Sequence, residues 1–260
     1  TTLTLMNSQQ TWVKLGERLS QLDNMVERQY QIIWDCCCDH GLLGMSLLLK
    51  KRAEQVVFVD VLKPQMLLLE GELQQWFPPS DYSWQVICDD LRAVELPSVG
   101  PQLFGIAGVG GNKTVEFIHS LCARMANVPF DLLLCSVHGN YAVRKALIEQ
   151  GFYLRQERIV LENRRFYEAI YVTKTAHEAV GEIGITGTVM WDLHLADHQA
   201  YLQKTLQHYR KKAAANPAEF AAVVDAYERL RPESASQVVG SCSEATDPAA
   251  RVDIKDNEIG

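Results

Sequence analysis

The sequence predicts an α/β fold in which a mainly parallel, doubly wound sheet of seven strands, the last one antiparallel, is followed by a small C-terminal helical hairpin. Between residues 31 and 175, short β-rich apolar runs alternate with longer segments of helical period, which is the pattern of β-α units. The last two apolar runs are separated by residues 162–166 alone, so they should pair as an antiparallel hairpin. Two further helical stretches flank Asn216-Pro217, a pair that ends one helix and begins another.

The predicted strands are the apolar runs rich in β-branched and aromatic residues. We expect them at residues 32–36, 56–61, 84–88, 103–107, 131–135, 154–161 and 167–172. The segments between them carry apolar residues at helical spacing, and we expect helices at 40–51, 64–76, 113–125 and 141–150. Gly151 stops the last of these helices in a normal C-cap position, so the chain enters the final two strands directly.

Helical periodicity also flanks the predicted sheet. Residues 8–27 predict a helix over one edge of the sheet, from apolar residues at Trp12, Leu15, Leu19, Leu22 and Val26. Residues 191–209 and 218–230 predict the two helices of the hairpin. Beyond residue 232, large apolar residues are too few to offset the entropy of ordering the chain. We therefore expect a sheet domain at 1–175, a helical hairpin at 176–231 and a disordered acidic tail at 232–260.

Composition predicts a globular protein of the cytoplasm. The chain holds no apolar run long enough to span a membrane, and its first thirty residues lack the order of a signal peptide, so we expect neither membrane insertion nor secretion. The seven cysteines are an odd number and lack zinc-type spacing. We expect them to be reduced and mostly buried, and we expect no metal site. The oligomeric state is not predicted.

The net charge of -7 is concentrated in the tail. Residues 1–175 hold 17 Lys/Arg and 19 Asp/Glu, residues 176–231 hold 6 and 7, and residues 232–260 hold 2 and 6. The nearly neutral body can still carry basic patches, which would either contact nucleic acid or form a solvated face. The candidate patches are Lys50-Lys51-Arg52, the set Arg155, Arg158, Arg164 and Arg165, and Arg210-Lys211-Lys212.

Acidic and small residues follow the first predicted strand, at the edge where an open α/β sheet binds its ligand. Residues 35–41 are Asp-Cys-Cys-Cys-Asp-His-Gly, and their small side chains let the backbone approach a ligand. Asp35 and Asp39 would repel a pyrophosphate but suit the ammonium and sulfonium charges of S-adenosylmethionine, which carries no phosphate. We expect cofactor contacts from Asp35, Cys37, Asp39 and His40. Asp39 as a plain helix cap is the structural alternative.

Two later strands end in acidic residues that suit a nucleoside. Asp60 is placed to accept hydrogen bonds from both ribose hydroxyls, as an acidic residue does in nicotinamide enzymes. Asp89 is placed to accept from the adenine amino group, although adjacent acids on a loop are often only solvent-facing. Both are predicted cofactor-binding residues.

The fourth strand is followed by a glycine-rich segment, Ala-Gly-Val-Gly-Gly at 107–111. The small or absent side chains of Ala107, Gly108 and Gly110 would leave room for a methyl donor and a flat base to meet. The structural alternative is a tight strand-to-helix turn that uses the same glycines. Because these glycines follow the fourth strand and not the first, they disfavour a dinucleotide cofactor.

Taken in order, the motifs resemble those of a known family. They are Asp-x-x-x-Asp-His-Gly at 35–41, Asp60, Cys-Asp-Asp-Leu at 88–91, Ile-Ala-Gly-Val-Gly-Gly at 106–111, Val-Arg-Lys-Ala-Leu at 143–147, Gly-Phe at 151–152, and Glu162 with Tyr-Glu at 167–168. From about residue 15 to 230 the chain resembles the TrmK-like bacterial tRNA (adenine-22 N1) methyltransferases. The resemblance implies a Rossmann-like class I methyltransferase sheet, S-adenosyl-L-methionine as cofactor, and tRNA as partner, bound in part by the helical hairpin.

The chain departs from the family pattern at several positions. Cys37 replaces the first-motif glycine, Asp90 replaces a glycine of the third motif, and Val109 replaces a methionine of the fourth. After the fifth strand the family usually shows Gln-Pro-Asn, at a position that touches the target base in related adenine methyltransferases, whereas this chain has Cys-Ser-Val at 135–137. The cofactor-contacting acids are thus present and the substrate-facing tripeptide is not. The cofactor class is therefore predicted more firmly than the substrate.

The resemblance also implies a mechanism with little acid-base chemistry. Adenine N1 attacks through an in-plane lone pair, so the acceleration should come from alignment and from exclusion of water. The base must be unpaired or flipped to expose N1. An acceptor facing the adenine amino group would make N1 more nucleophilic. The candidates are Asp39 or a carbonyl near Ala107, with His40 as a positioning group.

Other functions stay open at this point. A paralogue could bind the cofactor or RNA without efficient turnover, because the substrate-facing tripeptide is lost. A methyltransferase acting on small molecules or protein would give the hairpin and the basic patches no RNA role. A nicotinamide oxidoreductase is disfavoured by the missing glycines after the first strand and by the terminal hairpin.

Overall fold

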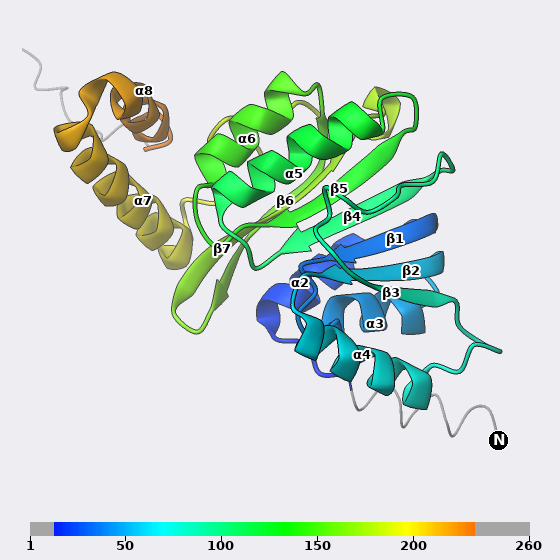
Figure 1. The fold of residues 1–260 in the computed structure, drawn as a ribbon. Coiled ribbons are helices and arrows are strands. Elements are labelled where there is room, and N and C mark those ends of the chain that lie inside the picture. The colour runs from blue at the N-terminus through cyan, green and yellow to red at the C-terminus, as the bar shows by residue number, and fades with distance from the viewer. Residues whose placement is uncertain (1–12, 232–260) are drawn as a thin grey trace, which may run out of the picture. The chain divides into compact units, whose positions relative to one another are not determined.

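A computed structural model describes residues 13–231 and contains a single seven-stranded sheet within them (Figure 1). The strand order is β3-β2-β1-β4-β5-β7-β6. The strands are β1 (Tyr30–Cys36), β2 (Ala53–Asp60), β3 (Trp84–Cys88), β4 (Gln102–Ala107), β5 (Phe130–Cys135), β6 (Tyr153–Glu162) and β7 (Arg165–Thr173). Neighbouring strands from β3 to β5 pair in parallel, and β7 runs antiparallel to both β5 and β6. The predicted fold class and terminal hairpin are confirmed.

Helices cover both faces of the sheet (Figure 1). They are α2 (Glu17–Met25), α3 (Leu42–Leu49), α4 (Lys63–Trp76), α5 (Gly111–Arg124), α6 (Asn140–Glu149), the 3-10 helix η1 (Ala176–Glu178), α7 (Ala196–Ala215) and α8 (Pro217–Glu228). Helices α2, α3 and α4 share one apolar core with the sheet, and α5 and α6 share the other. Burial on both faces explains why β1, β4 and β5 are continuous apolar runs instead of alternating ones.

Four predicted helix starts were wrong by two residues or more, and one of them is that of α5, which begins at Gly111 instead of residue 113. Helix α2 begins at Glu17 instead of residue 8; residues 13–16 are not helical, and residues 8–12 lie outside the described part. Helix α3 begins at Leu42 instead of residue 40, because the preceding loop holds left-handed residues that a helix cannot contain. Helix α7 begins at Ala196 instead of residue 191, because the Trp191 indole donates to the Thr186 carbonyl, 2.7 Å away, and fixes the chain there as a loop.

The helical hairpin of α7 and α8 packs against the sheet domain. Its apolar core includes Leu206, Tyr209 and Tyr227, and Tyr141 of α6 packs against it. The rings of Tyr209 and Tyr227 are stacked, with centroids 5.7 Å apart. Pro217 occupies the first turn of α8, where its missing N–H costs nothing. Asn216-Pro217 separates the two helices as predicted.

A buried ion cluster lies where this hairpin meets the sheet. The Arg144 guanidinium of α6 is fully buried between two carboxylates, 2.7 Å from Glu157 and 2.8 Å from Glu168. Burial alone would lower the pKa of Arg144, but the two carboxylates outweigh it and raise the pKa. The other Glu157 oxygen accepts backbone N–H groups of residues 188–190, so the cluster also fixes the chain leading into α7.

Acidic partners neutralise part of each predicted basic patch on the surface. The pairs are Lys50 with Asp23, Arg155 with Glu178, and Arg210 with Glu228.

All six cysteines of the described part are free thiols, and Cys88 is the exposed one. No helix between residues 13 and 231 is long and apolar enough to cross a membrane. The predicted acidic tail lies outside the described residues.

Candidate active site

A cavity of about 250 Å³ opens at the carboxyl ends of β1 and β4. This is where parallel α/β sheets bind their ligands, because the loops after the strands diverge there. Six of the predicted site residues line the cavity, and the remaining lining comes from α2, α3 and Cys38. The six are Asp35, Cys37, Asp39, His40, Ala107 and Gly108.

Asp35 is the most buried acid of this cavity. Its side chain is 6% exposed, and one carboxylate oxygen accepts the Gly44 N–H of α3 over 2.8 Å. Burial raises the pKa of Asp35 to about 7, the Gly44 hydrogen bond opposes this rise, and the nearby charge of Asp60 adds to it. A cation bound in the cavity would therefore convert the Asp35 carboxyl group fully to carboxylate.

The loop after β1 has an unusual backbone. Cys37, Asp39 and Gly41 have φ angles of 56°, 51° and 64°, all in the left-handed region. The first two are non-glycine residues in a conformation that costs roughly 1–2 kcal/mol each. Gly41, not Asp39, is the N-cap of α3, and the cap makes no side-chain hydrogen bond, so the interpretation of Asp39 as a helix cap was wrong.

The same loop presents Asp39 and His40 to solvent. Their side chains are 63% and 71% exposed, and the His40 Nε2 lies 3.7 Å from the Asp39 carboxylate. This pair is too exposed to be part of the core. In contrast, burial and then the charges of Asp60 and Asp35 raise the pKa of the Cys37 thiol to about 12. Cys37 therefore stays protonated and does not act as a nucleophile at neutral pH.

Three predicted site residues lie outside the lining of the cavity. Asp60 ends β2, and its two carboxylate oxygens accept the N–H groups of Asp39, at 3.2 Å, and Leu62, at 3.0 Å. Asp89 is exposed and lines a separate pocket of about 370 Å³ along the face of β1, β2 and β3. A Cβ atom built on Gly110 would lie 2.7 Å from the His138 ring, so this glycine provides space for His138.

One charged cavity residue was missed by sequence reasoning. Arg18 of α2 lines the cavity, and its guanidinium lies over the Tyr167 ring, 5.2 Å from the centroid. Its Nε and Nη1 atoms are buried and donate no hydrogen bond to any described residue; the nearest carboxylate oxygen, of Glu162, is 3.8 Å from Nε. The expected helix over the sheet edge was the available signal, but it did not identify which side chain points inward.

The comparisons with known proteins identify the family. A family model described as a methyltransferase domain matches residues 15–170, more than half of the chain. The chain belongs to the methyltransferase domain family. No curated protein matches this methyltransferase.

Solved structures share its fold. The tRNA methyltransferase TrmK of B. subtilis superposes with a TM-score of 0.67 at 16% identity, covering 84% of this chain and 98% of that one. A Streptococcus pneumoniae protein solved with S-adenosyl-L-methionine gives 0.63 at 16% identity, with coverage of 83% and 99%. TrmK of M. capricolum, solved with S-adenosyl-homocysteine, gives 0.62 at 14% identity, with coverage of 83% and 96%. These likenesses extend over the helical hairpin.

At the end of β5 this methyltransferase has Cys-Ser-Val at residues 135–137, where the TrmK-like pattern has Gln-Pro-Asn. Cys135 and Ser136 are buried, and the Ser136 hydroxyl forms a 2.8 Å hydrogen bond with Thr114 of α5. Val137 alone of the three is exposed, at 42%. Residues 135–137 therefore offer a ligand an apolar side chain and no side-chain amide.

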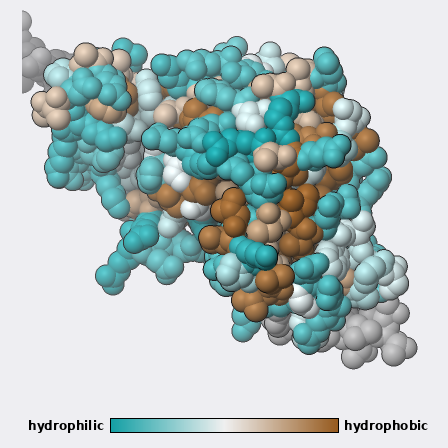
Figure 2. Space-filling model, viewed as in Figure 1, coloured by the Kyte–Doolittle hydropathy of each residue, from teal (hydrophilic) through white to brown (hydrophobic). Residues whose placement is uncertain are grey.

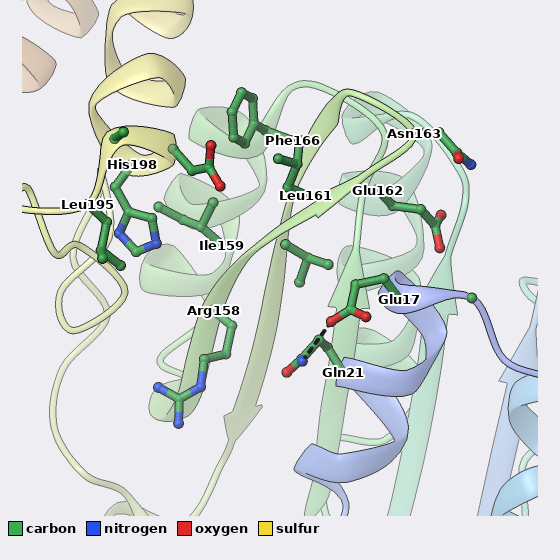
Figure 3. Close-up of a pocket in the computed structure, with 14 residues that line it drawn as sticks. Glu17, Gln21, Arg158, Ile159, Leu161, Glu162, Asn163, Phe166, Leu195 and His198 are labelled. Atoms are coloured by element: carbon green, nitrogen blue, oxygen red, sulfur yellow. Dashed lines mark hydrogen bonds between the residues drawn. The ribbon is translucent and has the colours of Figure 1, made fainter.

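A larger groove of about 970 Å³ runs along β6, between α2 and the residues that lead into α7 (Figure 3). Glu17 and Gln21 project from α2 on one side, and Leu195 and His198 lie on the other. The groove lies along the edge strand β6, and its lining includes no residue from the carboxyl ends of β1 and β4. We assign the chemistry to the smaller cavity. Among the described residues, no group of His, Cys, Asp and Glu side chains is arranged to hold a metal ion.

Proposed function

We propose that this protein is an S-adenosylmethionine-dependent methyltransferase that methylates N1 of an adenine in tRNA. Membership of the methyltransferase domain family supports the reaction class. The observation that carries the cofactor assignment is the cavity at the ends of β1 and β4, which is lined by one partly buried guanidinium and two carboxylates. The tRNA and cofactor named for the solved relatives support the rest.

The charges of the cavity fit the amino-acid end of this cofactor. That end carries a carboxylate and an ammonium group, and the sulfonium adds a second positive charge. Arg18 offers buried N–H groups without a described acceptor, which suits the carboxylate. Asp35 of β1 and Asp39 of the loop after it suit the positive groups. Charges of both signs in one cavity would fix the orientation of a zwitterion.

The surface beside Asp60 fits the nucleoside end. Each Asp60 oxygen accepts one backbone N–H and keeps further capacity as an acceptor for ribose hydroxyls. Val61 and Leu62 follow it with 60% and 49% exposure, and hydrophobic residues gather over the start of α4 (Figure 2). Exposed apolar side chains next to a carboxylate suit a flat, apolar base attached to a sugar.

When bound, the cofactor supplies an activated methyl group. The chain itself has to bind and orient the acceptor base and to exclude water, and it needs no strong general base because adenine N1 presents a free lone pair. This agrees with a site whose thiol Cys37 is held protonated and whose Asp39 and His40 are exposed. We assign Asp39 and His40 to positioning at the rim.

The helical hairpin supplies the tRNA contacts in this proposal. Lys204, Lys211 and Lys212 are exposed on α7 and would meet phosphates. Their contribution should appear as a loss of affinity with rising salt. Each of the three predicted basic patches is partly neutralised by an ion pair, and in the α7 patch the pair involves Arg210 and leaves Lys211 and Lys212 exposed.

The test is incubation of the protein with methyl-labelled S-adenosylmethionine and total bacterial tRNA, followed by nucleoside mass spectrometry. We expect label in tRNA as N1-methyladenosine. Label in another nucleoside would overturn the adenine assignment, and label in protein or small molecules alone would overturn the RNA assignment. Cofactor binding by calorimetry without transfer would favour a binding paralogue, the alternative that the buried Cys135 and Ser136 keep open.

A further inference from the structure

The long groove beside β6 has no part in the proposed methyl transfer. Its volume is about 970 Å³, and its lining includes every residue from 158 to 163 (Figure 3). Successive side chains of a strand point to opposite faces of its sheet, so a groove that touches all of them runs along the edge of the strand. β6 is the last strand of the sheet and has a neighbour, β7, on one side only. The groove therefore exposes the outer edge of β6.

The turn between β6 and β7 determines which backbone groups face this edge. The turn residues 163–164 have φ angles of 50° and 62°, as a two-residue hairpin turn of type I′ requires. Glu162 and Arg165 flank this turn, so they are paired directly and exchange backbone hydrogen bonds. Hydrogen-bonded and non-bonded pairs alternate along antiparallel strands. The N–H and C=O groups of Ile159 and Leu161 therefore point away from β7.

This outer edge is open from residue 158 to the end of the strand at 162. Nearer its start β6 is covered, because Leu154 exchanges backbone hydrogen bonds with residues 180–181 and the Glu157 carboxylate accepts N–H groups of residues 188–190. No backbone group of the described residues outside the sheet bonds to residues 159 or 161. Unpaired N–H and C=O groups on a strand edge are a template for another strand.

One face of the open stretch is apolar. Ile159 and Leu161 point to this face, and Leu161 is 39% exposed. Phe166, which is paired with Leu161 in β7, packs there against Tyr201 of α7. Leu195, just before α7, lines the same groove and is 50% exposed. A strand placed in the groove would cover these apolar side chains.

The other face, under α2, carries opposite charges at its two ends. Arg158 is exposed and forms no ion pair with any residue between 13 and 231. Glu162 lies at the far end, where one carboxylate oxygen accepts the Arg18 N–H over 3.1 Å and the other keeps capacity as an acceptor. Glu17 of α2 adds an exposed carboxylate to the lining of the groove. Val160, midway between Arg158 and Glu162, is buried.

From this arrangement we infer that the outer edge of β6 is a dimer interface, where β6 pairs antiparallel with β6 of a second copy about a two-fold axis at Val160. Ile159 of each copy then exchanges backbone hydrogen bonds with Leu161 of the other. The same register places Arg158 of each copy opposite Glu162 of the other, which gives two cross-strand ion pairs. The inference concerns assembly and does not rest on the proposed reaction.

The charges select this register among the neighbouring ones. Moving the axis to residue 161 would place Arg158 opposite Arg164 of the second copy, and like charges directly opposite each other are destabilising. Moving it to residue 159 would place Arg158 opposite the buried Val160. An unrelated strand would have to supply matching charges at matching spacing, whereas a second copy of this chain carries them. We therefore assign the groove to a second copy.

The test is sedimentation equilibrium of the full chain over a range of protein concentrations. We expect a reversible dimer. Arg158→Glu and Glu162→Arg should each weaken self-association at least about tenfold, because like charges then face each other twice per dimer. An equimolar mixture of the two variants should dimerise again, since it restores opposite charges at both positions. Lys145→Glu, which makes the same charge change at a 64% exposed position on α6, is the matched control and should dimerise like the unmodified protein.

Hydrogen exchange in the unmodified protein tests the backbone pairing directly. The amides of Ile159 and Leu161 should exchange more slowly as the dimer fraction rises, while those of Arg158 and Val160, bonded to β7 in the monomer, should not change. Leu161→Pro removes one outward N–H and should abolish dimerisation, whereas Leu161→Val keeps the N–H and should preserve it. Circular dichroism checks that the variants are folded.

Three results would each overturn the inference. They are a protein that stays monomeric up to its solubility limit, a dimer that both charge variants leave intact, and exchange at Ile159 and Leu161 that does not depend on protein concentration. A mixture of the two charge variants that stays monomeric while each variant is folded would overturn the register and with it the axis at Val160.

Discussion

The Tyr201 hydroxyl of α7 donates a 2.7 Å hydrogen bond to the Glu168 carboxylate of β7, and both side chains are buried. Glu168 in turn holds Arg144 of α6. A single chain of polar contacts thus joins the helical hairpin to the last strand of the sheet. It also sets the orientation of the Asn140 amide, whose buried Oδ1 accepts no hydrogen bond from any described residue.

Tyr201→Phe removes that hydroxyl and leaves Glu168 paired with Arg144 alone. We expect a loss of about 1–2 kcal/mol in the free energy of unfolding, measured by urea denaturation, because a buried hydrogen bond to a charged group is lost. Cofactor affinity should not change, since Tyr201 lies outside that cavity. Tyr153→Phe, at the start of β6, is the control and should stay within roughly 0.5 kcal/mol of the unmodified protein. Equal losses in both variants would contradict the assignment.

Arg144→Met leaves Glu157 and Glu168 fully buried without their countercharge. We expect a loss of about 3–5 kcal/mol at pH 8. Urea denaturation of the variant and of the unmodified protein measures this loss. The same change at the exposed Arg158 should have little effect.

Arg18→Ala should weaken S-adenosylhomocysteine binding by about 1.5–3 kcal/mol, because a charge-assisted hydrogen bond to the ligand carboxylate is lost. Arg18→Lys should recover only part of this, since an ammonium lacks the planar fork of a guanidinium. Titration calorimetry gives both values, and Lys14→Ala on the nearby exposed surface is the control. Unchanged affinity in Arg18→Ala would remove Arg18 from the cofactor site.

Cofactor binding should depend on pH through Asp35, whose pKa is raised to about 7, chiefly by burial. A cationic ligand favours the carboxylate and lowers this pKa, so binding below pH 7 must release a proton. Affinity should therefore rise by up to about fivefold from pH 6 to pH 7 and by about twofold more to pH 8, and then level off. Asp35→Asn keeps an acceptor for the Gly44 N–H and should bind more weakly with a flatter profile over this pH range. A profile as steep as that of the unmodified protein would exclude Asp35 as the titrating group.

Cys37→Gly should raise stability by up to about 1 kcal/mol. The left-handed backbone at this position, with φ of 56°, costs a non-glycine residue roughly 1–2 kcal/mol, and the greater freedom of glycine in the unfolded chain offsets part of the gain. Cys36→Gly, next to it in β1 and buried, should instead lower stability because it leaves a cavity. Thermal unfolding of both variants measures the difference, and a loss in both would argue against strain at Cys37.

The sequence by itself determined the sheet. The spacing of apolar residues and the lengths of the apolar runs predicted seven strands, and the missing helix before β7 predicted the terminal hairpin. These features depend only on which residues are apolar and on where helices are interrupted. It also placed Asp35, Asp39, Ala107 and Gly108 at one edge, since the carboxyl ends of parallel strands meet there.

The tertiary structure alone decided the rest. Arg18 reaches the cavity because α2 packs across the sheet, and local pattern does not specify how a helix is rotated about its axis. Cys37 and Asp39 have left-handed backbone conformations although neither is glycine, so the sequence does not reveal the shape of this loop. Contacts elsewhere in the fold offset the strain. The free oxygen of Asn140 follows from where the proton of Tyr201 is donated, and that depends on residues from three elements that meet only in the folded chain.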